Sequence, residues 1–336
     1  MDDRLATRFD IPVRPRRNRV SAAVRSLVRE TEPSPGHLIW PAFVIEGRGA
    51  EQPVDSMPGV SRLSRDLLVE RAREVHALGV PALALFPALP DERKDRWASE
   101  STNRDGLLQT TVRALKDAVP GLCVITDVAM DPYSSDGHDG VVHEGRILND
   151  PTLEILAAMA VSQAEAGADI VAPSDMMDGR VGVIRAALDE CGHQDVGILA
   201  YSAKYASAFY GPFRDALDSA PRAGDKKTYQ MDPANAREAL REVELDVSEG
   251  ADIVMVKPAL AYLDVITRVR QAVDLPVAAY QVSGEYAMIE AVAANGWMDR
   301  DALLLETLTA IFRAGADMVL TYHAPQAARL LRDAAR

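Results

Sequence analysis

The chain has 336 residues, of which 48% are hydrophobic, so it is long enough to bury a sizeable core in one large domain or two ordinary ones. Acidic residues outnumber basic residues by 50 to 37, and the resulting net charge of −13 argues against a nucleic-acid-binding surface. Cys123 and Cys191 show no metal-type spacing, Met1 begins no apolar signal segment, and no apolar run has the length of a membrane span. We therefore expect a cytoplasmic protein without membrane or nucleic-acid partners.

The first 36 residues are basic in an otherwise acidic protein. Their arginines include Arg14, Arg16, Arg17, Arg19, Arg25 and Arg29. The opposite charge of the remaining chain predicts an arm that packs on an acidic surface of the same protein or of a neighbouring subunit. An RNA-binding arm and a disordered segment are the alternatives. We therefore predict an N-terminal arm over 1–36, which makes oligomer contacts, and a catalytic domain over 37–336.

From residue 37, short apolar runs alternate with helical patterns. The predicted strands are 38–45, 80–86, 122–128, 168–173, 196–202, 251–257, 275–282 and 316–322. The predicted helices are 61–78, 106–118, 152–166, 179–191, 233–249, 259–273, 284–294 and 300–313. The sequence Gly-Ala-Asp precedes an apolar run three times, at 167–169, 250–252 and 315–317. Eight alternations predict an α/β fold, the (β/α)8 TIM barrel. An open doubly wound sheet is disfavoured because no glycine-rich phosphate turn follows the first strand.

Lysines lie at the ends of two predicted strands. Lys257 ends one apolar run, and Pro258 prevents the strand from continuing. Lys204 follows the run 196–202. Burial and a second nearby ammonium group both lower the pKa of a lysine, and a neutral amine attacks carbonyl carbons. A salt bridge at a strand end would explain Lys257 alone, but two lysines at adjacent strand ends favour a functional role.

Barrel active sites lie at the carboxyl ends of the strands. Polar side chains gather at those predicted ends: Asp127, Ser174, Asp175, Ser202, Lys204, Lys257, Ser283, Tyr322 and His323. The connections 129–150 and 205–232 are long enough to be lids, and Arg214, Lys226 and Lys227 in the second suit a carboxylate substrate. The connection 129–150 contains four polar residues that suit either a hard cation such as Mg²⁺ or tight turns: Asp131, Asp136, His138 and Asp139. A thiolate zinc site is excluded in this connection because it has no cysteine.

Three segments carry a family resemblance: residues 201–214, 255–258 and 280–286, which read YSAKYASAFYGPFR, MVKP and YQVSGEY. They resemble porphobilinogen synthase, also called delta-aminolevulinic acid dehydratase, and the resemblance runs from about residue 10 to the C-terminus. It implies a (β/α)8 barrel whose arm wraps a partner subunit, usually within a homo-octamer, although the residues themselves do not distinguish an octamer from a hexamer. It also implies the condensation of two 5-aminolevulinate molecules to porphobilinogen in tetrapyrrole and heme biosynthesis.

The resemblance assigns roles to individual residues. Lys257 matches the lysine that forms a Schiff base with substrate in the P site, and Lys204 matches the imine lysine of the A site. Asp127 matches the acidic residue beside this pair. The expected substrate-binding residues are Arg214 and Lys226 for the A-site carboxylate, Ser283 and Tyr322 for the P-site carboxylate, and Gln230, Phe213 and Tyr280. Many relatives have arginine where Lys226 stands.

The resemblance also bears on metals. Zinc-dependent members carry three cysteines where this chain has Ala129, Asp131 and Asp139, so a catalytic zinc ion is not expected. Magnesium, potassium or no metal at Asp131 and Asp139 are the alternatives. Glu242 matches a ligand of a separate, activating and allosteric Mg²⁺ site near a subunit interface; it is otherwise a solvated helix carboxylate. No organic cofactor is expected.

Two other functions fit parts of the pattern. A class I Schiff-base aldolase needs one imine lysine, so the second lysine would be idle, and the last strands lack the expected glycine-rich phosphate site. A barrel that only binds or scaffolds would need neither lysine. Trapping of 5-aminolevulinate on Lys257 by borohydride separates the dehydratase from both.

Overall fold

A computed structural model describes residues 11–217 and 221–334. The chain forms two compact units, Met1–Glu32 and Pro33–Arg336. The first contains the 3-10 helix η2 (Pro15–Arg19) and helix α1 (Ala22–Leu27), in which no residue is buried. Residues 1–10 of the predicted arm lie outside the described residues, and its oligomer contacts stay a prediction.

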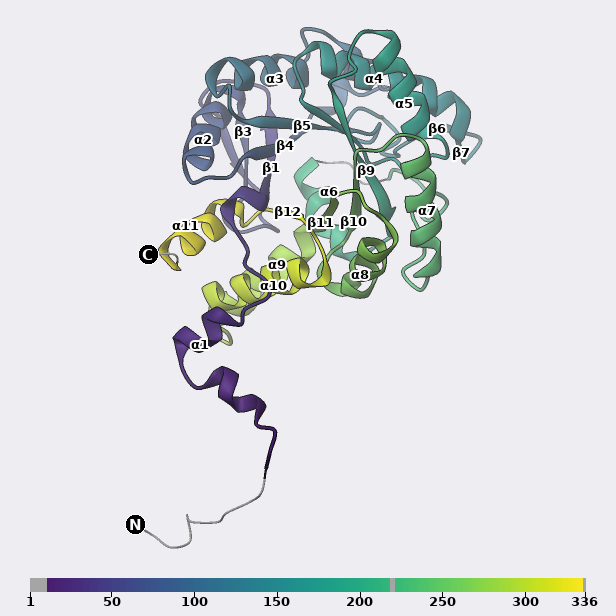
Figure 1. Cartoon of the computed structure of the whole chain (residues 1–336). Coiled ribbons are helices and arrows are strands. Elements are labelled where there is room, and N and C mark those ends of the chain that lie inside the picture. Colours follow the sequence, from purple (N-terminus) through teal and green to yellow (C-terminus); the bar gives the residue numbers. More distant parts are fainter. Residues whose placement is uncertain (1–10, 218–220, 335–336) are drawn as a thin grey trace, which may run out of the picture. The chain divides into compact units, whose positions relative to one another are not determined.

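Eight parallel strands close into a barrel in the larger unit, with helices outside them (Figure 1). In spatial order they are β1 (Leu38–Ile45), β4 (Ala82–Pro87), β5 (Cys123–Val128), β8 (Ile170–Pro173), β9 (Gly197–Lys204), β10 (Ile253–Lys257), β11 (Val277–Gln281) and β12 (Met318–Thr321). The barrel closes where β12 pairs with β1, Leu38 opposite Val319. The predicted TIM barrel is confirmed, and this closure rules out the open sheet.

The connections contain the predicted helices and several short elements that were not predicted. The α-helices of the barrel are α2 (Arg65–Ala77), α3 (Leu107–Ala118), α4 (Asn149–Glu165), α5 (Arg180–Glu190), α7 (Arg237–Ser248), α8 (Leu263–Ala272), α9 (Ser283–Ala294), α10 (Arg300–Ala314) and α11 (Ala324–Ala334). The 3-10 helices are η3 (Pro35–His37), η4 (Asp91–Arg93), η5 (Ser99–Thr102) and η7 (Leu260–Tyr262). None of the described helices combines the length and the hydrophobicity that a membrane span requires.

The sequence pattern missed helix α11, and it missed or misassigned structure in three further places. Residues 61–64, predicted as helix, form strand β3 (Ser61–Ser64), which pairs with β1 and with β2 (Glu51–Pro53). The loop 129–150 contains a hairpin, β6 (Val141–His143) and β7 (Arg146–Leu148). The connection 205–232 contains η6 (Ala208–Tyr210) and α6 (Gly211–Leu217). Such short elements depend on their neighbours, because a few residues carry too little periodicity to be recognised.

Alternate strand residues face the barrel interior and the surrounding helices. In β10, Val254 and Val256 pack in the cluster that includes helix residues, whereas Met255 packs with interior aromatic side chains such as Tyr280. Both strand faces are therefore apolar, as the continuous apolar runs predict for a buried parallel sheet.

The repeated Gly-Ala-Asp junctions close the amino ends of three strands. The glycines adopt left-handed φ angles of 102°, 103° and 118°, which end the preceding helices without steric strain. Each aspartate then accepts a hydrogen bond from an amide of the neighbouring strand: Asp169 from Val124 at 2.7 Å, Asp252 from Ile198 at 2.7 Å, and Asp317 from Val277 at 2.8 Å. These contacts stabilise the end of the barrel opposite the predicted active site.

Replacing Asp252 with alanine should therefore cost stability without affecting catalysis. The buried amide of Ile198 would lose its side-chain acceptor, and we expect the free energy of unfolding to fall by about 1–2 kcal/mol. Urea denaturation measures this change. Asp252→Asn, which keeps an acceptor oxygen, is the control and should lie between the alanine variant and the parent. An alanine variant as stable as the parent would contradict the capping role.

Candidate active site

The two predicted lysines end neighbouring strands. Lys204 is the last residue of β9, Lys257 is the last residue of β10, and the two are opposite each other in the strand register. The register shifts between Val254 and Val256, so that Lys204 rather than Ala203 faces Lys257. One inserted residue exchanges the two faces of a strand. This irregularity places both amines on the same side of the sheet.

Aromatic rings surround the amine of Lys257. Its Nζ atom lies 5.0 Å from the ring centre of Tyr201, 5.1 Å from those of Tyr210 and Phe213, and 4.7 Å from that of Tyr280. The side chain is buried, and within the described part of the chain it forms no ion pair. Burial, followed by the charge of Lys204, lowers the pKa of Lys257 to about 7. The amine is therefore a nucleophile near neutral pH. The alternative prediction, a salt bridge at Lys257, is wrong, because no carboxylate among the described residues pairs with this amine.

Lys204 lies on the polar side of the pair. Its Nζ atom donates a hydrogen bond to the carbonyl oxygen of Ser174 and lies 4.0 Å from Oδ2 of Asp139. The two lysines thus have different environments, since one amine faces rings and the other faces a carbonyl and a carboxylate. This difference allows the two amines to hold two substrate molecules in unlike ways.

Three aspartates complete this polar side. Burial, followed by the charge of Asp131, raises the pKa of Asp127 to about 7. Burial and the charge of Asp139 raise the pKa of Asp131. Burial alone would raise the pKa of Asp139, but the ammonium groups of Lys226 and Lys204 outweigh it and lower this pKa to about 2. Asp127 can therefore exchange a proton near neutral pH, whereas Asp139 stays ionised.

Lys226 lies between two of these aspartates. Its Nζ atom donates at 3.1 Å to Oδ2 of Asp131 and at 3.1 Å to Oδ2 of Asp139. Among the described residues, no group of three or more His, Cys, Asp and Glu side chains is placed to hold a metal ion. An ion between the two aspartates would have to displace the ammonium group, so the residues as arranged do not fit a metal there, and that site stays a prediction.

The predicted P-site residues converge around Lys257. Ser283, the first residue of α9, accepts a hydrogen bond from the amide of Phe213 at 3.0 Å. The hydroxyl groups of Tyr280 and Tyr322 are 3.0 Å apart. Since Phe213 and Tyr280 each present a ring to the Lys257 amine, the four residues belong to one site.

The two remaining predicted substrate-binding residues belong to the long connection over the site. Arg214 is half-buried in α6. Gln230 is buried, and its side-chain oxygen has no hydrogen-bond partner among the described residues. A buried oxygen without a donor is costly unless a ligand or water supplies one. Their contacts with substrate stay predictions.

Sequence reasoning missed some of the residues that shape this site. Tyr201 and Tyr210 lie within the quoted segment 201–214, but nothing in it marks their rings as contacts of Lys257. Arg180 was also missed; it is buried, binds both carboxylate oxygens of Asp246 at 2.7 and 3.0 Å, and donates to the Tyr201 carbonyl at 3.3 Å. The arginine and its partner are separated by 66 positions, so no local pattern could reveal the pair.

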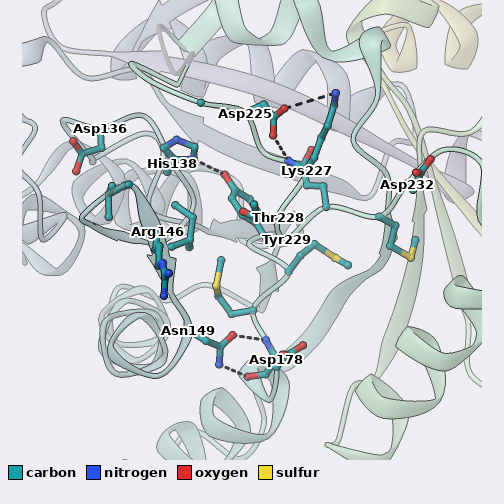
Figure 2. A pocket seen from close by; sticks show the side chains of 18 of the residues that line it. Asp136, His138, Arg146, Asn149, Asp178, Asp225, Lys227, Thr228, Tyr229 and Asp232 are labelled. Atoms are coloured by element: carbon teal, nitrogen blue, oxygen red, sulfur yellow. Dashed lines mark hydrogen bonds and ion pairs between the residues drawn. The ribbon is translucent and has the colours of Figure 1, made fainter.

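The lining of a pocket of about 970 Å³ includes the predicted magnesium ligand Glu242 and the predicted substrate-binding residue Gln230. Figure 2 shows His138, Tyr229 and Asp178 in its wall. Its lining includes the loop around His138 and the segment around Tyr229, which share a hydrogen bond of 3.1 Å. Glu242 is half-buried, and burial raises its pKa. The positive charge of Arg180 offsets part of this effect, whereas Asp246, and Asp178 in the same lining, add negative charge near Glu242. Because Mg²⁺ is commonly held by one or two carboxylates and several waters, these residues fit a hydrated magnesium ion.

Comparison with known proteins decides the family. The model of the delta-aminolevulinic acid dehydratase family matches residues 12–330. The chain belongs to this family. A delta-aminolevulinic acid dehydratase of Synechococcus elongatus is 56% identical over 322 residues, covering 95% of this chain and 98% of that protein. One from Bradyrhizobium diazoefficiens is 55% identical, covering 96% and 92%. These findings confirm the resemblance and identify the chain as an enzyme.

A solved structure of the same family confirms the fold. The delta-aminolevulinic acid dehydratase (porphobilinogen synthase) of Toxoplasma gondii, in complex with the reaction product porphobilinogen, superposes with a TM-score of 0.94. It is 54% identical in sequence, and the match covers 95% of this chain and 92% of that chain.

The environment of Lys257 predicts how its reactivity depends on pH. Because only the neutral amine reacts, acetylation of Lys257 should be half-maximal near pH 7 and fall at lower pH. This midpoint lies far below the ordinary pKa of lysine, which is about 10.4. Removing the nearby charge with Lys204→Ala should move the midpoint upward, whereas Lys204→Arg should leave it near the parent value. Mass spectrometry of acetylated peptides measures the midpoint. A parent midpoint near 10 would contradict the site as described.

Proposed function

We propose that this enzyme condenses two molecules of 5-aminolevulinate to porphobilinogen, in tetrapyrrole biosynthesis, through Schiff bases on Lys257 and Lys204. The observation that carries the proposal is the register of β9 and β10, which brings two buried lysines to adjacent strand ends. The family assignment supports it, as does the product named in the related T. gondii structure.

The chemistry follows from two neighbouring amines. A neutral amine adds to a substrate ketone, water leaves, and the protonated imine withdraws electrons from the adjacent carbon. That carbon then loses a proton and attacks the second substrate, which the other lysine holds. Each imine releases one molecule of water as it forms. The carbon–carbon bond and the carbon–nitrogen bond of the ring then form, and each step displaces one lysine amine, so the overall condensation releases two molecules of water. Holding both ketones converts a bimolecular step into an oriented one, which can contribute about 7–11 kcal/mol to lowering the barrier.

The surrounding residues fit roles in binding and proton transfer. Asp127 has a pKa suited to moving protons at the lysine pair. Ser283 and Tyr322 supply hydroxyl groups for the carboxylate of the P-site substrate. Arg214 and Lys226 supply positive charge for the second substrate, and Lys226 then exchanges at least part of its contact with Asp131 and Asp139 for the substrate carboxylate.

We further propose that Mg²⁺ activates the enzyme at the Glu242 pocket and that the arm joins subunits into a homo-octamer. The half-buried carboxylate of Glu242 and the nearby charge of Asp178 support the cation site. A bound magnesium ion would supply positive charge that compensates for these carboxylates. A catalytic zinc ion at the aspartate loop has no such support, since the zinc-binding cysteines are replaced.

Lys257→Ala should abolish pyrrole formation while leaving the fold intact, because one of the two amines that form imines is lost. The parent, treated with 5-aminolevulinate and borohydride, should become covalently labelled at Lys257. Lys116→Ala is the control, since Lys116 pairs with Asp169 at the amino end of the barrel. A Lys257→Ala rate within a few-fold of the parent would disprove the Schiff-base role.

Stripping with EDTA should lower the rate of pyrrole formation, and added Mg²⁺ should restore it. Glu242→Gln should remove this response, because an amide is a weaker ligand for a hard cation. Full activity of the parent in EDTA would exclude an essential metal ion. Restoration that survives in Glu242→Gln would instead place the ion at Asp131 and Asp139.

A further inference from the structure

The segment from Ala208 to Leu217, here called the η6–α6 segment, covers the amine of Lys257. It contributes two of the four rings around Nζ, those of Tyr210 and Phe213. The hydroxyl group of Tyr210 also donates to the backbone carbonyl of Lys257 at 3.1 Å. The same segment carries Arg214, which is predicted to bind the second substrate. Its position therefore affects both halves of the proposed reaction.

This segment rests on the first turn of α9. Ser283 Oγ accepts a hydrogen bond from the amide of Phe213 at 3.0 Å and donates one to the carbonyl of Phe209 at 3.3 Å. These two bonds fix both ends of a short stretch of the segment against one side chain. The next residue, Gly284, lies directly against the same stretch.

Gly284 has no room for a side chain. A Cβ atom there would lie 2.5 Å from the carbonyl oxygen of Phe209, 2.8 Å from its Cα and 3.0 Å from its carbonyl carbon. All three are backbone atoms, so no side-chain rotation can relieve the overlap. The φ angle of Gly284 is not left-handed, so close approach, not backbone conformation, is what requires glycine here.

The first turn of α9 is itself tied to the Lys257 segment. Glu285, which is 2% exposed, accepts a hydrogen bond from the amide of Val282 at 2.7 Å. Its other oxygen accepts one from the amide of Leu260 at 2.6 Å. Leu260 follows Lys257 by three residues. One buried carboxylate thus holds the start of α9 at a set position relative to the reactive lysine.

We propose that Gly284 is a positioning residue: its missing side chain lets the η6–α6 segment rest on α9, and so sets the positions of Phe213 and Arg214 over the two substrates. The proposal rests on the function proposed above. Imine formation on Lys257 depends on the segment only through two of the four rings around the amine, since Tyr201 and Tyr280 contact it from the strands. Bond formation between the two substrates needs the segment in place, because Arg214 lies on it.

Gly284→Ala therefore separates the two steps. A misplacement of about 1 Å can cost about a hundredfold in rate, so we expect pyrrole formation to fall about tenfold to a hundredfold, with a higher KM. Borohydride trapping of 5-aminolevulinate on Lys257 should stay within about threefold of the parent. Hydrogen–deuterium exchange of the peptide 205–217 should become faster, because the amide of Phe213 loses its acceptor.

Gly182→Ala is a matched control. Gly182 also lies in the first turn of a barrel helix, α5, but the nearest atom to a Cβ there is a flexible side-chain atom of Glu249, at 3.5 Å. It should match the parent in rate, trapping and exchange.

The outcomes distinguish this proposal from the proposed function. Parental pyrrole formation or parental exchange in Gly284→Ala would overturn the positioning role. A parent enzyme that forms no pyrrole would overturn the proposed function, while the exchange comparison would still test the contact. If Gly284→Ala does not fold, Ser283→Ala removes the acceptor of the Phe213 amide without adding volume. Unchanged exchange at peptide 205–217 in that variant would overturn the proposal.

Discussion

Two ammonium groups brought together at the ends of neighbouring strands impose the main constraint on this protein. Each would be costly to bury alone, and their mutual repulsion adds to that cost. The two amines have different surroundings. Aromatic rings surround Lys257, whereas a backbone carbonyl and a carboxylate lie beside Lys204. These surroundings lower the pKa of Lys257. Its neutral amine is then available as the nucleophile that the proposed chemistry needs.

The other charged groups of the site are buried close together around this pair. Lys226 neutralises two aspartates that would otherwise repel each other, and Asp127 is left with one oxygen unpaired among the described residues. Such unfavourable arrangements are typical of active sites, where pKa values depart from their ordinary range. At the opposite end of the barrel, Asp169, Asp252 and Asp317 each accept a hydrogen bond from a backbone amide.

Much of the fold was predictable because barrel strands are buried on both faces and separated by amphipathic helices. All eight predicted strands exist, with boundaries that differ by a few residues. Helix α11 was not predicted, and β3 was predicted as helix. Strand β3 is recognisable only through its partners, because its hydrogen bonds go to β1 and β2, which lie elsewhere in the sequence.

The order of residues alone was enough to indicate the barrel, the rim that carries the chemistry and the two lysines, since strand alternation places successive strand ends side by side. Packing settled the rest. The register shift opposite Val254 and Val256 turns Lys204 toward Lys257, and a strict two-residue alternation would have placed Ala203 there instead. The rings of Tyr210 and Phe213 likewise reach the amine only because a distant glycine, Gly284, leaves space for their segment. These contacts join residues that are far apart along the chain. Their geometry depends on side-chain volumes and on the register of strand pairing, which a local sequence pattern does not predict.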